Sequence, residues 1–280
     1  MSRPEFSLAY LTAFGTAPAR MVDIAAETGY DYVSLRLTPV TDHEPTFPYF
    51  TDPSVVADVK ARMADTGISV LDVELIRVGK DDDPADYGRF MEVASDLGAR
   101  HLIMQLPDPD RSRAAERFAQ TCQMAAPHRM TVDLEFIPWS TTEDLAAAVE
   151  IVTKADQPNG GVLVDTLHFA RSKSSVADLQ LLPENLFNFV QLCDAPFEAP
   201  RTHEGLINAA RTARSLPGQA GLDLRPVMDA IPRVPYSLEV PNDVMRNDLG
   251  VEEFARRVLR AGQTFLGRDE TESATTGQHR

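Results

Sequence analysis

The stretch that decides the fold is residues 131–165, which read TVDLEFIPWSTTEDLAAAVEIVTKADQPNGGVLVD. It opens with a short run of β-branched and apolar residues, Thr131–Ile137, and closes with another, Val162–Asp165. Between them, Thr142–Lys154 has the spacing of an amphipathic helix, with a threonine as its N-cap and acidic residues in its first turn. Strand, helix and strand in this order predict a β–α–β unit with parallel strands.

The same alternation runs along the whole chain. The other strand-like runs are Phe6–Leu11, Tyr32–Leu37, Ile68–Val78, His101–Leu106, Phe187–Leu192 and Tyr236–Val240. The other helical patterns are Ala17–Thr28, Asp52–Thr66, Asp83–Leu97, Arg111–Met124 and Val251–Phe265. Eight parallel units over residues 1–267 predict an α/β fold, a single (β/α)8 TIM barrel that forms one catalytic domain. A doubly wound open sheet is the alternative, but it usually has fewer strands for this length.

Three segments fall outside this rhythm. Thr38–Phe50 carries three prolines and no periodicity, so we expect a long loop over one end of the barrel. This loop is a candidate lid over the barrel or a candidate contact between subunits. In the second case the protein would form a homo-oligomer. Asp194–Pro235 is the longest connection. Residues 268–280 are polar, and we expect them to form a disordered C-terminal tail.

Composition excludes several classes of protein. The 280 residues include 42 Asp and Glu against 27 Lys and Arg, a formal charge of −15, which argues against a nucleic-acid partner. No apolar run approaches the roughly 20 residues of a membrane span, and the N-terminus has no apolar signal core. The two cysteines are too few for a disulfide framework, so we expect a cytoplasmic protein.

Four consecutive strands end in an oxygen-bearing side chain: Glu135, Asp165, Gln191 and Glu239. In a (β/α)8 barrel these strand ends meet at the mouth where chemistry takes place. A single carboxylate at a strand end is more often a helix cap or part of a salt bridge. Three carboxylates at one mouth repel each other, by about 4 kcal/mol for each pair about 4 Å apart at an effective dielectric of about 20. A cation between them removes the repulsion, and oxygen ligands favour Mg²⁺ or Mn²⁺. The pattern predicts one divalent metal ion held by these four residues.

His168 follows Asp165 by three residues and lies just beyond the strand. It is either a substrate contact or proton donor beside the metal, or a structural histidine that bonds the next strand. His101, at the start of its strand, lies at the opposite end of the barrel and is expected to be structural. The chain has no GxSxG elbow, GxGxxG turn or P-loop, so serine hydrolase, dinucleotide and P-loop activities have no support.

Several motifs together resemble a known family. They are Leu134-Glu135-Phe136-Ile137-Pro138-Trp139, Val164-Asp165-Thr166-Leu167-His168-Phe169, Val190-Gln191-Leu192-Cys193-Asp194-Ala195-Pro196, Arg214-Ser215-Leu216-Pro217-Gly218 and Ser237-Leu238-Glu239-Val240. In this order they resemble the xylose-isomerase-like TIM-barrel superfamily, and within it the sugar phosphate isomerase/epimerase branch. The resemblance implies one Mn²⁺ or Mg²⁺ bound at the same four strand ends, with His168 and Arg214 as substrate contacts. Gln191 stands where many epimerases have His, and this difference leaves the substrate open.

The resemblance implies a metal-dependent isomerase or epimerase of a ketose or related polyhydroxy carbonyl compound. Proton transfer would pass through an enediolate, with Glu135 and Glu239 as the catalytic pair on opposite sides of the ion. A lyase is the alternative, in which a β-hydroxyl leaves after the same proton abstraction, from an inosose- or dehydroshikimate-like substrate. A non-catalytic barrel that binds a sugar-like ligand is the third hypothesis.

Overall fold

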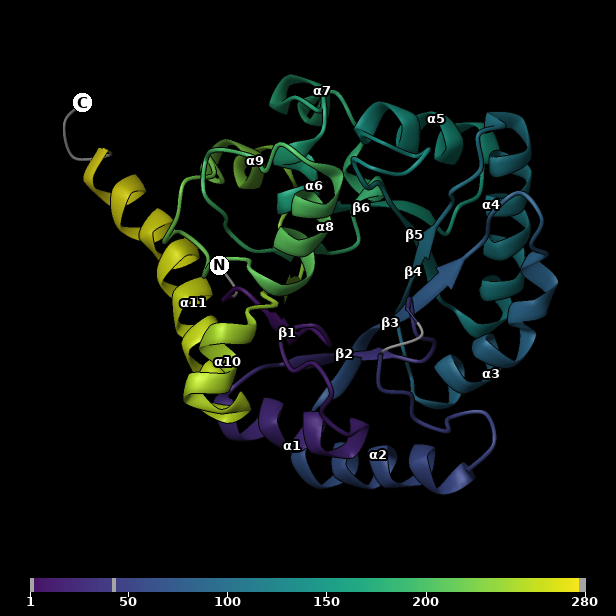
Figure 1. Cartoon of the computed structure of the whole chain (residues 1–280), viewed down its shortest axis with the longest axis horizontal. Coiled ribbons are helices and arrows are strands. Elements are labelled where there is room, and N and C mark those ends of the chain that lie inside the picture. The colour runs from purple at the N-terminus through teal and green to yellow at the C-terminus, as the bar shows by residue number, and fades with distance from the viewer. Residues whose placement is uncertain (1–2, 42–43, 277–280) are drawn as a thin grey trace.

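A computed structural model describes residues 3–41 and 44–276, with side chains as far as Gly267. Eight parallel strands form a closed barrel in which β1 pairs with both β2 and β8 (Figure 1). The strands are β1 (Phe6–Leu8), β2 (Tyr32–Arg36), β3 (Ser69–Arg77), β4 (His101–Gln105), β5 (Thr131–Glu135), β6 (Gly160–Asp165), β7 (Val190–Leu192) and β8 (Tyr236–Leu238). Each lies in or overlaps a run predicted from the sequence. The (β/α)8 barrel is confirmed, and the open sheet is excluded.

The helices surround the barrel, as Figure 1 shows. They are α1 (Pro18–Thr28), α2 (Pro53–Thr66), α3 (Gly88–Asp96), α4 (Arg111–Ala125), α5 (Leu145–Ala155), α6 (Thr166–Arg171), α7 (Val176–Gln180), α8 (His203–Thr212), α9 (Arg225–Ala230), α10 (Asp243–Leu249) and α11 (Val251–Thr276). The helical patterns read from the sequence correspond to α1–α5 and α11. The shorter helices α6–α10 were not predicted, because five to ten residues are too few to show a helical period. No described helix is both long enough and apolar enough to span a membrane.

The start of α5 corrects one prediction. Asp144, and not a threonine, is the N-cap, and its Oδ1 accepts a hydrogen bond from the Ala147 amide at 2.9 Å. Thr142 is unavailable for this role, because its hydroxyl donates to the Leu106 carbonyl oxygen at 2.8 Å. That contact ties the loop after β5 to the end of β4, and the helix therefore begins three residues later than the pattern suggested.

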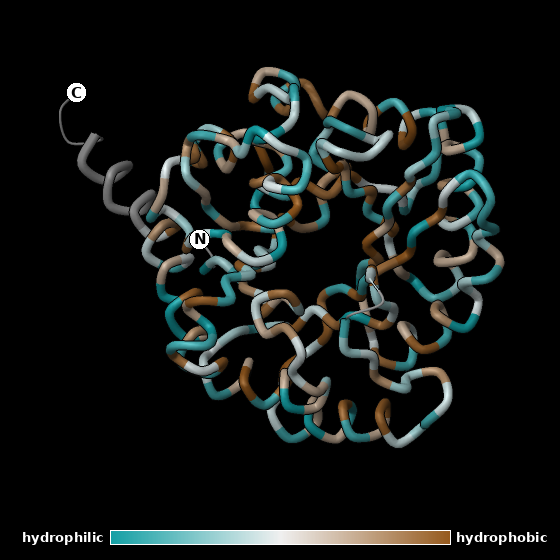
Figure 2. The backbone as a smooth tube through the Cα atoms, in the orientation of Figure 1, coloured by the Kyte–Doolittle hydropathy of each residue, from teal (hydrophilic) through white to brown (hydrophobic). Residues whose placement is uncertain are grey.

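Apolar side chains form two layers. The larger core fills the space between strands and helices, where the helices alternate brown and teal in Figure 2 as their faces turn inward and outward. A smaller cluster fills the barrel itself and consists of Tyr32, Leu71, Leu75, Ile103, Leu163 and Phe189. This inner layer separates the two ends of the barrel, so the mouth at the carboxyl ends of the strands is closed from below.

Two further predictions concern the cysteines and the tail. Cys122 and Cys193 are both buried and unpaired, as expected for core residues. The backbone of α11 continues to Thr276, past the start of the tail predicted at 268–280. The side chains from position 268 onward and all of residues 277–280 lie outside the described residues, so the disorder of this tail stays a prediction.

Candidate active site

A cavity of about 360 Å³ opens at the carboxyl ends of the strands. Side chains from six of the strand ends line it: Arg36, Glu74, Gln105, Glu135, Gln191 and Glu239. The loop predicted at Thr38–Phe50 contributes Val40, Thr41 and Glu44, so its described part lies over this mouth. The cavity therefore occupies the place where the sequence predicted the chemistry.

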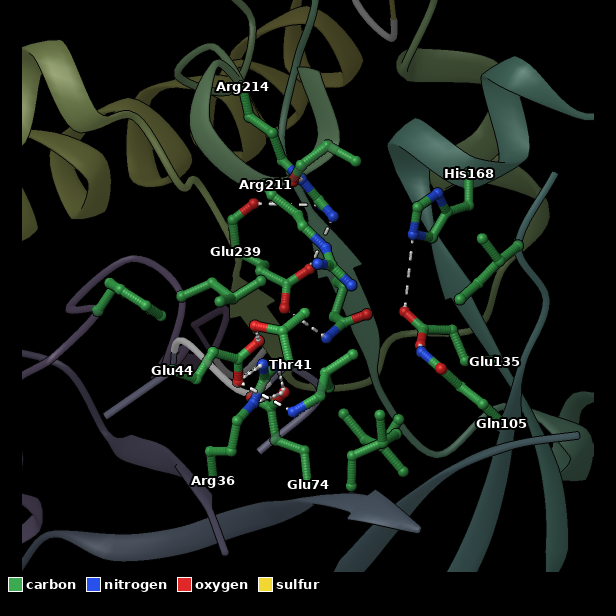
Figure 3. A pocket seen from close by; sticks show the side chains of 18 of the residues that line it. Arg36, Thr41, Glu44, Glu74, Gln105, Glu135, His168, Arg211, Arg214 and Glu239 are labelled. Carbon is green, nitrogen blue, oxygen red and sulfur yellow. Dashed lines mark hydrogen bonds and ion pairs between the residues drawn. The ribbon is translucent and has the colours of Figure 1, made fainter. Parts of the chain in front are cut away.

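Glu135 is the last residue of β5, and its carboxyl group is buried. Gln105, the last residue of β4, donates a hydrogen bond from Nε2 to Glu135 Oε2 at 2.5 Å. On the other side, His168 Nε2 lies 3.9 Å from Glu135 Oε1 (Figure 3). Burial, reinforced by the charge of Asp165, raises the pKa of Glu135 to about 7. A carboxyl group with this pKa can take up and release a proton near neutral pH.

Asp165 and Glu239 share one cation, the buried guanidinium of Arg214. Arg214 Nη1 lies 2.5 Å from Asp165 Oδ2, and Nη2 lies 3.0 Å from Glu239 Oε2. Burial opposes ionisation of Asp165, but Arg214, His168 and the hydrogen bond from the His168 amide outweigh it and lower the pKa to about 2. Burial raises the pKa of Glu239, and Arg214 opposes that rise. Arg214 therefore holds two of the four predicted metal ligands in position.

Two buried polar atoms at the site have no hydrogen-bond partner among the described residues: Gln191 Oε1 and His168 Nδ1. The other end of the Gln191 amide donates from Nε2 to Glu239 Oε1 at 3.1 Å. A buried carbonyl oxygen without a partner is costly unless a ligand satisfies it. An amide oxygen is a competent ligand for a hard divalent cation, so the orphaned Gln191 oxygen fits a metal at this position.

The donor set supports a divalent metal. Glu135, Asp165 and His168 each offer one ligand atom, and these three atoms lie within 4.8 Å of one another. The sequence predicted Glu135, Asp165, Gln191 and Glu239, and the structure brings all four to the same mouth. Asp165 is the exception in one respect, because it lies behind Arg214 and does not line the cavity. Glu135 and Asp165 belong to both sets, and His168 is a candidate ligand as well as a candidate substrate contact.

Further residues from the strand ends and loops complete the mouth. Arg36 at the end of β2 binds Glu44 from the loop at 2.8 Å and also pairs with Glu74 from β3. Trp139 packs edge-on against His168, with ring centroids 5.2 Å apart. Arg211 also lines the cavity, from the last turn of α8, and no pattern in the sequence indicated this position.

His101 lies far from this mouth, as the sequence predicted. It is the first residue of β4, and its Nδ1 lies 2.7 Å from the Thr131 hydroxyl. The ring stacks on Phe189, with centroids 5.2 Å apart. His101 thus belongs to a polar network at the floor of the barrel and has a structural role.

Fold and site together define a barrel with a candidate metal centre at the carboxyl ends of its strands. The chain matches the family model described as "Xylose isomerase-like TIM barrel" over residues 22–262, and it belongs to that family. The resemblance read from the strand 5–8 motifs is therefore confirmed.

Two curated relatives are both named 3-dehydroshikimate dehydratase. One, from Pseudomonas aeruginosa, is 27% identical over 261 residues, which are 86% of this chain and 38% of the relative. The other, from Pseudomonas putida, is 33% identical over 100 residues, which are 34% of this chain and 15% of the relative. The chain thus spans less than half the length of the curated relatives that it matches.

Solved structures share the fold. A crystal structure of the IolI protein with a bound zinc atom has a TM-score of 0.78 at 18% identity, covering 94% of this chain and 98% of the other. A D-allulose 3-epimerase from Methylomonas has a TM-score of 0.65 at 16% identity, covering 93% of this chain and 96% of the other. At these identities the likeness shows the barrel alone.

Proposed function

We propose that this protein is a divalent-metal-dependent dehydratase, a lyase that removes water from a cyclic polyhydroxy ketone of the dehydroshikimate or inosose kind. The observation that carries the proposal is the relative named 3-dehydroshikimate dehydratase, which aligns with 86% of this chain. The site supports it, because three buried carboxyl groups and the Gln191 amide oxygen form a donor set for one cation. Mn²⁺ and Mg²⁺ are the ions that these oxygen donors favour, and Zn²⁺ is the alternative if His168 is a ligand.

When bound, the metal supplies Lewis-acid polarisation of the substrate ketone. The proton on the neighbouring carbon then becomes acidic, and Glu135 is the group placed to take it. Its Oε1 accepts no hydrogen bond among the described side chains, while Gln105 holds Oε2. The electron pair of the broken C–H bond forms the enolate, which expels the β-hydroxyl as its C–O bond breaks. That hydroxyl leaves as water when it receives the proton that Glu135 has taken up.

His168 is placed to orient the leaving hydroxyl through a hydrogen bond. Burial lowers the pKa of His168 to about 4, with the Arg214 charge also acting in that direction, so the imidazole is neutral at working pH. A neutral ring donates one N–H and accepts at the other nitrogen. Trp139 fixes the ring edge-on, which leaves Nε2 facing Glu135.

Glu239 is less available as a second base. Its Oε2 is bound to Arg214 and its Oε1 accepts from Gln191. Epimerisation needs proton exchange on two faces of the substrate, whereas dehydration can proceed with one base, Glu135. The pairing of Glu239 therefore favours the lyase over the isomerase or epimerase that the sequence motifs favoured. Ketose epimerisation by Glu135 and Glu239 stays the second candidate, because both carboxyl groups line the same cavity.

The test is to strip the protein of metal, reload it with Mn²⁺, Mg²⁺ or Zn²⁺, and incubate it with 3-dehydroshikimate, an inosose, D-fructose and D-allulose. Dehydration of 3-dehydroshikimate followed by enolisation gives an aromatic ring, whose ultraviolet absorbance and NMR signals report turnover directly. We expect metal-dependent product from a cyclic ketone, with kcat reduced about 100-fold or more by Glu135→Gln. If the protein interconverts D-fructose and D-allulose but removes no water from 3-dehydroshikimate or the inosose, the dehydratase is wrong and the epimerase is favoured.

A further inference from the structure

Four arginines line the cavity, and they fall into two pairs. Arg36 and Arg214 are largely buried and bind carboxylates. Arg77 and Arg211 lie at the rim of the same cavity and are exposed. No described residue forms an ion pair or a side-chain hydrogen bond with either of their guanidinium groups.

Among the described residues, each carboxylate that lines the cavity already has another partner. The carboxylates that line the cavity are Glu44, Glu74, Glu135, Glu239 and Asp243. Arg36 binds the first two, Arg214 binds Glu239, and Arg246 binds Asp243 at 2.8 Å. Glu135 faces His168 and belongs to both candidate metal sets. Arg77 and Arg211 thus bring to the cavity wall two guanidinium groups that no described carboxylate contacts.

Their positions connect them to the candidate metal centre. Arg77 ends β3 and pairs in register with Gln105, whose amide bonds Glu135. Arg211 precedes Arg214 by three residues, and Figure 3 shows it beside Arg214 and Glu239, across the cavity from Glu135. Both arginines line the same cavity of about 360 Å³.

We propose that Arg77 and Arg211 form a subsite for the carboxylate of the substrate. This inference rests on the proposed dehydratase function and narrows its substrate to a carboxylated cyclic ketone of the 3-dehydroshikimate class, in preference to a neutral inosose or ketose. A ring with a ketone at one position and a carboxylate at another can place the ketone at the metal ligands and the carboxylate at the rim. Guanidinium groups match a planar carboxylate through paired N–H donors.

Binding tests the subsite independently of turnover. Protein loaded with Mn²⁺ and freed of excess metal is titrated calorimetrically with 3,4-dihydroxybenzoate and with catechol, which has the same hydroxyls but no carboxylate. We expect the acid to bind about tenfold or more tightly than catechol, the range of one charge-assisted hydrogen bond. The double variant Arg77→Gln/Arg211→Gln should lose this preference and leave catechol affinity unchanged, whereas Arg77→Lys/Arg211→Lys should keep part of it.

The control is Arg89→Gln, because Arg89 is an exposed arginine that pairs with Glu92 on α3, outside the cavity lining. It should leave both affinities as they are in the unmodified protein. Equal affinity for the two ligands, no binding of the acid, or a preference that survives the double Gln variant would each overturn the subsite. If the acid is preferred through these arginines but no cyclic ketone is dehydrated, the subsite stands and the proposed dehydratase falls. If 3-dehydroshikimate is dehydrated with an unchanged KM in the double variant, the dehydratase stands and the subsite falls.

Discussion

At the scale of the residue, Arg214 decides the electrostatics of the candidate site. Its guanidinium is buried and in contact with Asp165 and Glu239, two of the predicted metal ligands. It also donates from Nε to the Ala210 carbonyl oxygen at 2.8 Å, which fixes its direction. The sequence motif suggested only a substrate contact for this residue. Its role in the structure is to compensate two carboxylates that would otherwise be buried without a charge partner.

Replacing Arg214 should therefore destabilise the metal-free protein strongly. In Arg214→Met, Asp165 and Glu239 lose their cation, and removal of one partner from a buried pair typically costs about 3–5 kcal/mol. Urea unfolding with and without Mn²⁺ measures this cost. Because a bound cation replaces part of the lost charge, Mn²⁺ should stabilise the variant more than the unmodified protein. An unfolding free energy within about 1 kcal/mol of the original, without metal, would contradict this account.

His101 gives a pH-dependent prediction at the same scale. Burial, with the charge of Arg100, lowers the pKa of His101 to about 4, against about 6.5 in an unfolded chain. Between these values the unfolded state binds the proton and the folded state does not, so stability falls as the pH falls from about 6.5 to about 4. The contribution is about 3 kcal/mol.

His101→Gln should remove this part of the pH dependence. Urea unfolding of both proteins at a series of pH values measures the contribution. The two stability curves should draw together as the pH falls from about 6.5 to about 4 and keep a constant separation above about pH 6.5. Curves that run parallel over this range would show that His101 is protonated equally in the folded and unfolded states.

At the scale of the element, the start of β6 requires a glycine, because side chains of neighbouring elements approach its backbone closely. A Cβ added at Gly161 would lie 2.6 Å from both Asp133 Oδ1 and Asn188 Nδ2. These two atoms bond each other at 2.7 Å, so neither can move without breaking that hydrogen bond. The glycine is required by this contact between β5, β6 and the segment before β7.

Gly161→Ala should consequently destabilise the protein by about 2–3 kcal/mol, the usual cost of overpacking a rigid site. Gly88→Ala is the matched control, because Gly88 begins α3 and a Cβ there meets nothing within 4 Å. That change should be neutral or stabilising, since alanine favours a helix over glycine. Thermal unfolding of the two variants tests the comparison, and equal melting temperatures would contradict it.

At the scale of the whole molecule, the four residues predicted as metal ligands come from the ends of four consecutive strands, β5 to β8. A ligand that binds only the folded state adds about 3 kcal/mol of stability at a hundredfold excess over its dissociation constant. We expect Mn²⁺ to raise the melting temperature saturably with one ion per chain, and a chelator to reverse the effect. If no divalent ion changes the melting temperature, the hypothesis of a metal centre is wrong.

The same measurement separates the two candidate ligand sets. Gln191→Leu removes an amide oxygen without changing charge, and it should reduce the stabilisation by Mn²⁺ if Gln191 is a ligand. His168→Phe should leave that stabilisation in place. The opposite result, with His168→Phe abolishing the effect and Gln191→Leu sparing it, would assign the ion to Glu135, Asp165 and His168.

The sequence by itself determined the barrel and grouped the four residues predicted as metal ligands. Apolar runs that alternate with amphipathic helices specify parallel strands, and the ends of such strands must meet at one mouth. For this reason Glu135, Asp165, Gln191 and Glu239 could be grouped before any coordinates were known.

Only the tertiary structure decided how these residues are paired. Arg214 binds Asp165 across 49 positions of the chain, and Gln105 binds Glu135 across 30. Arg77 and Arg211 differ from the other arginines of the cavity because no described carboxylate pairs with them. No local sequence pattern predicts this difference. Local periodicity records which face of an element is buried, but pairing between side chains depends on how distant elements pack together. That packing leaves Glu135 Oε1 without a hydrogen bond from a described side chain and places Arg77 and Arg211 in the lining of the same cavity.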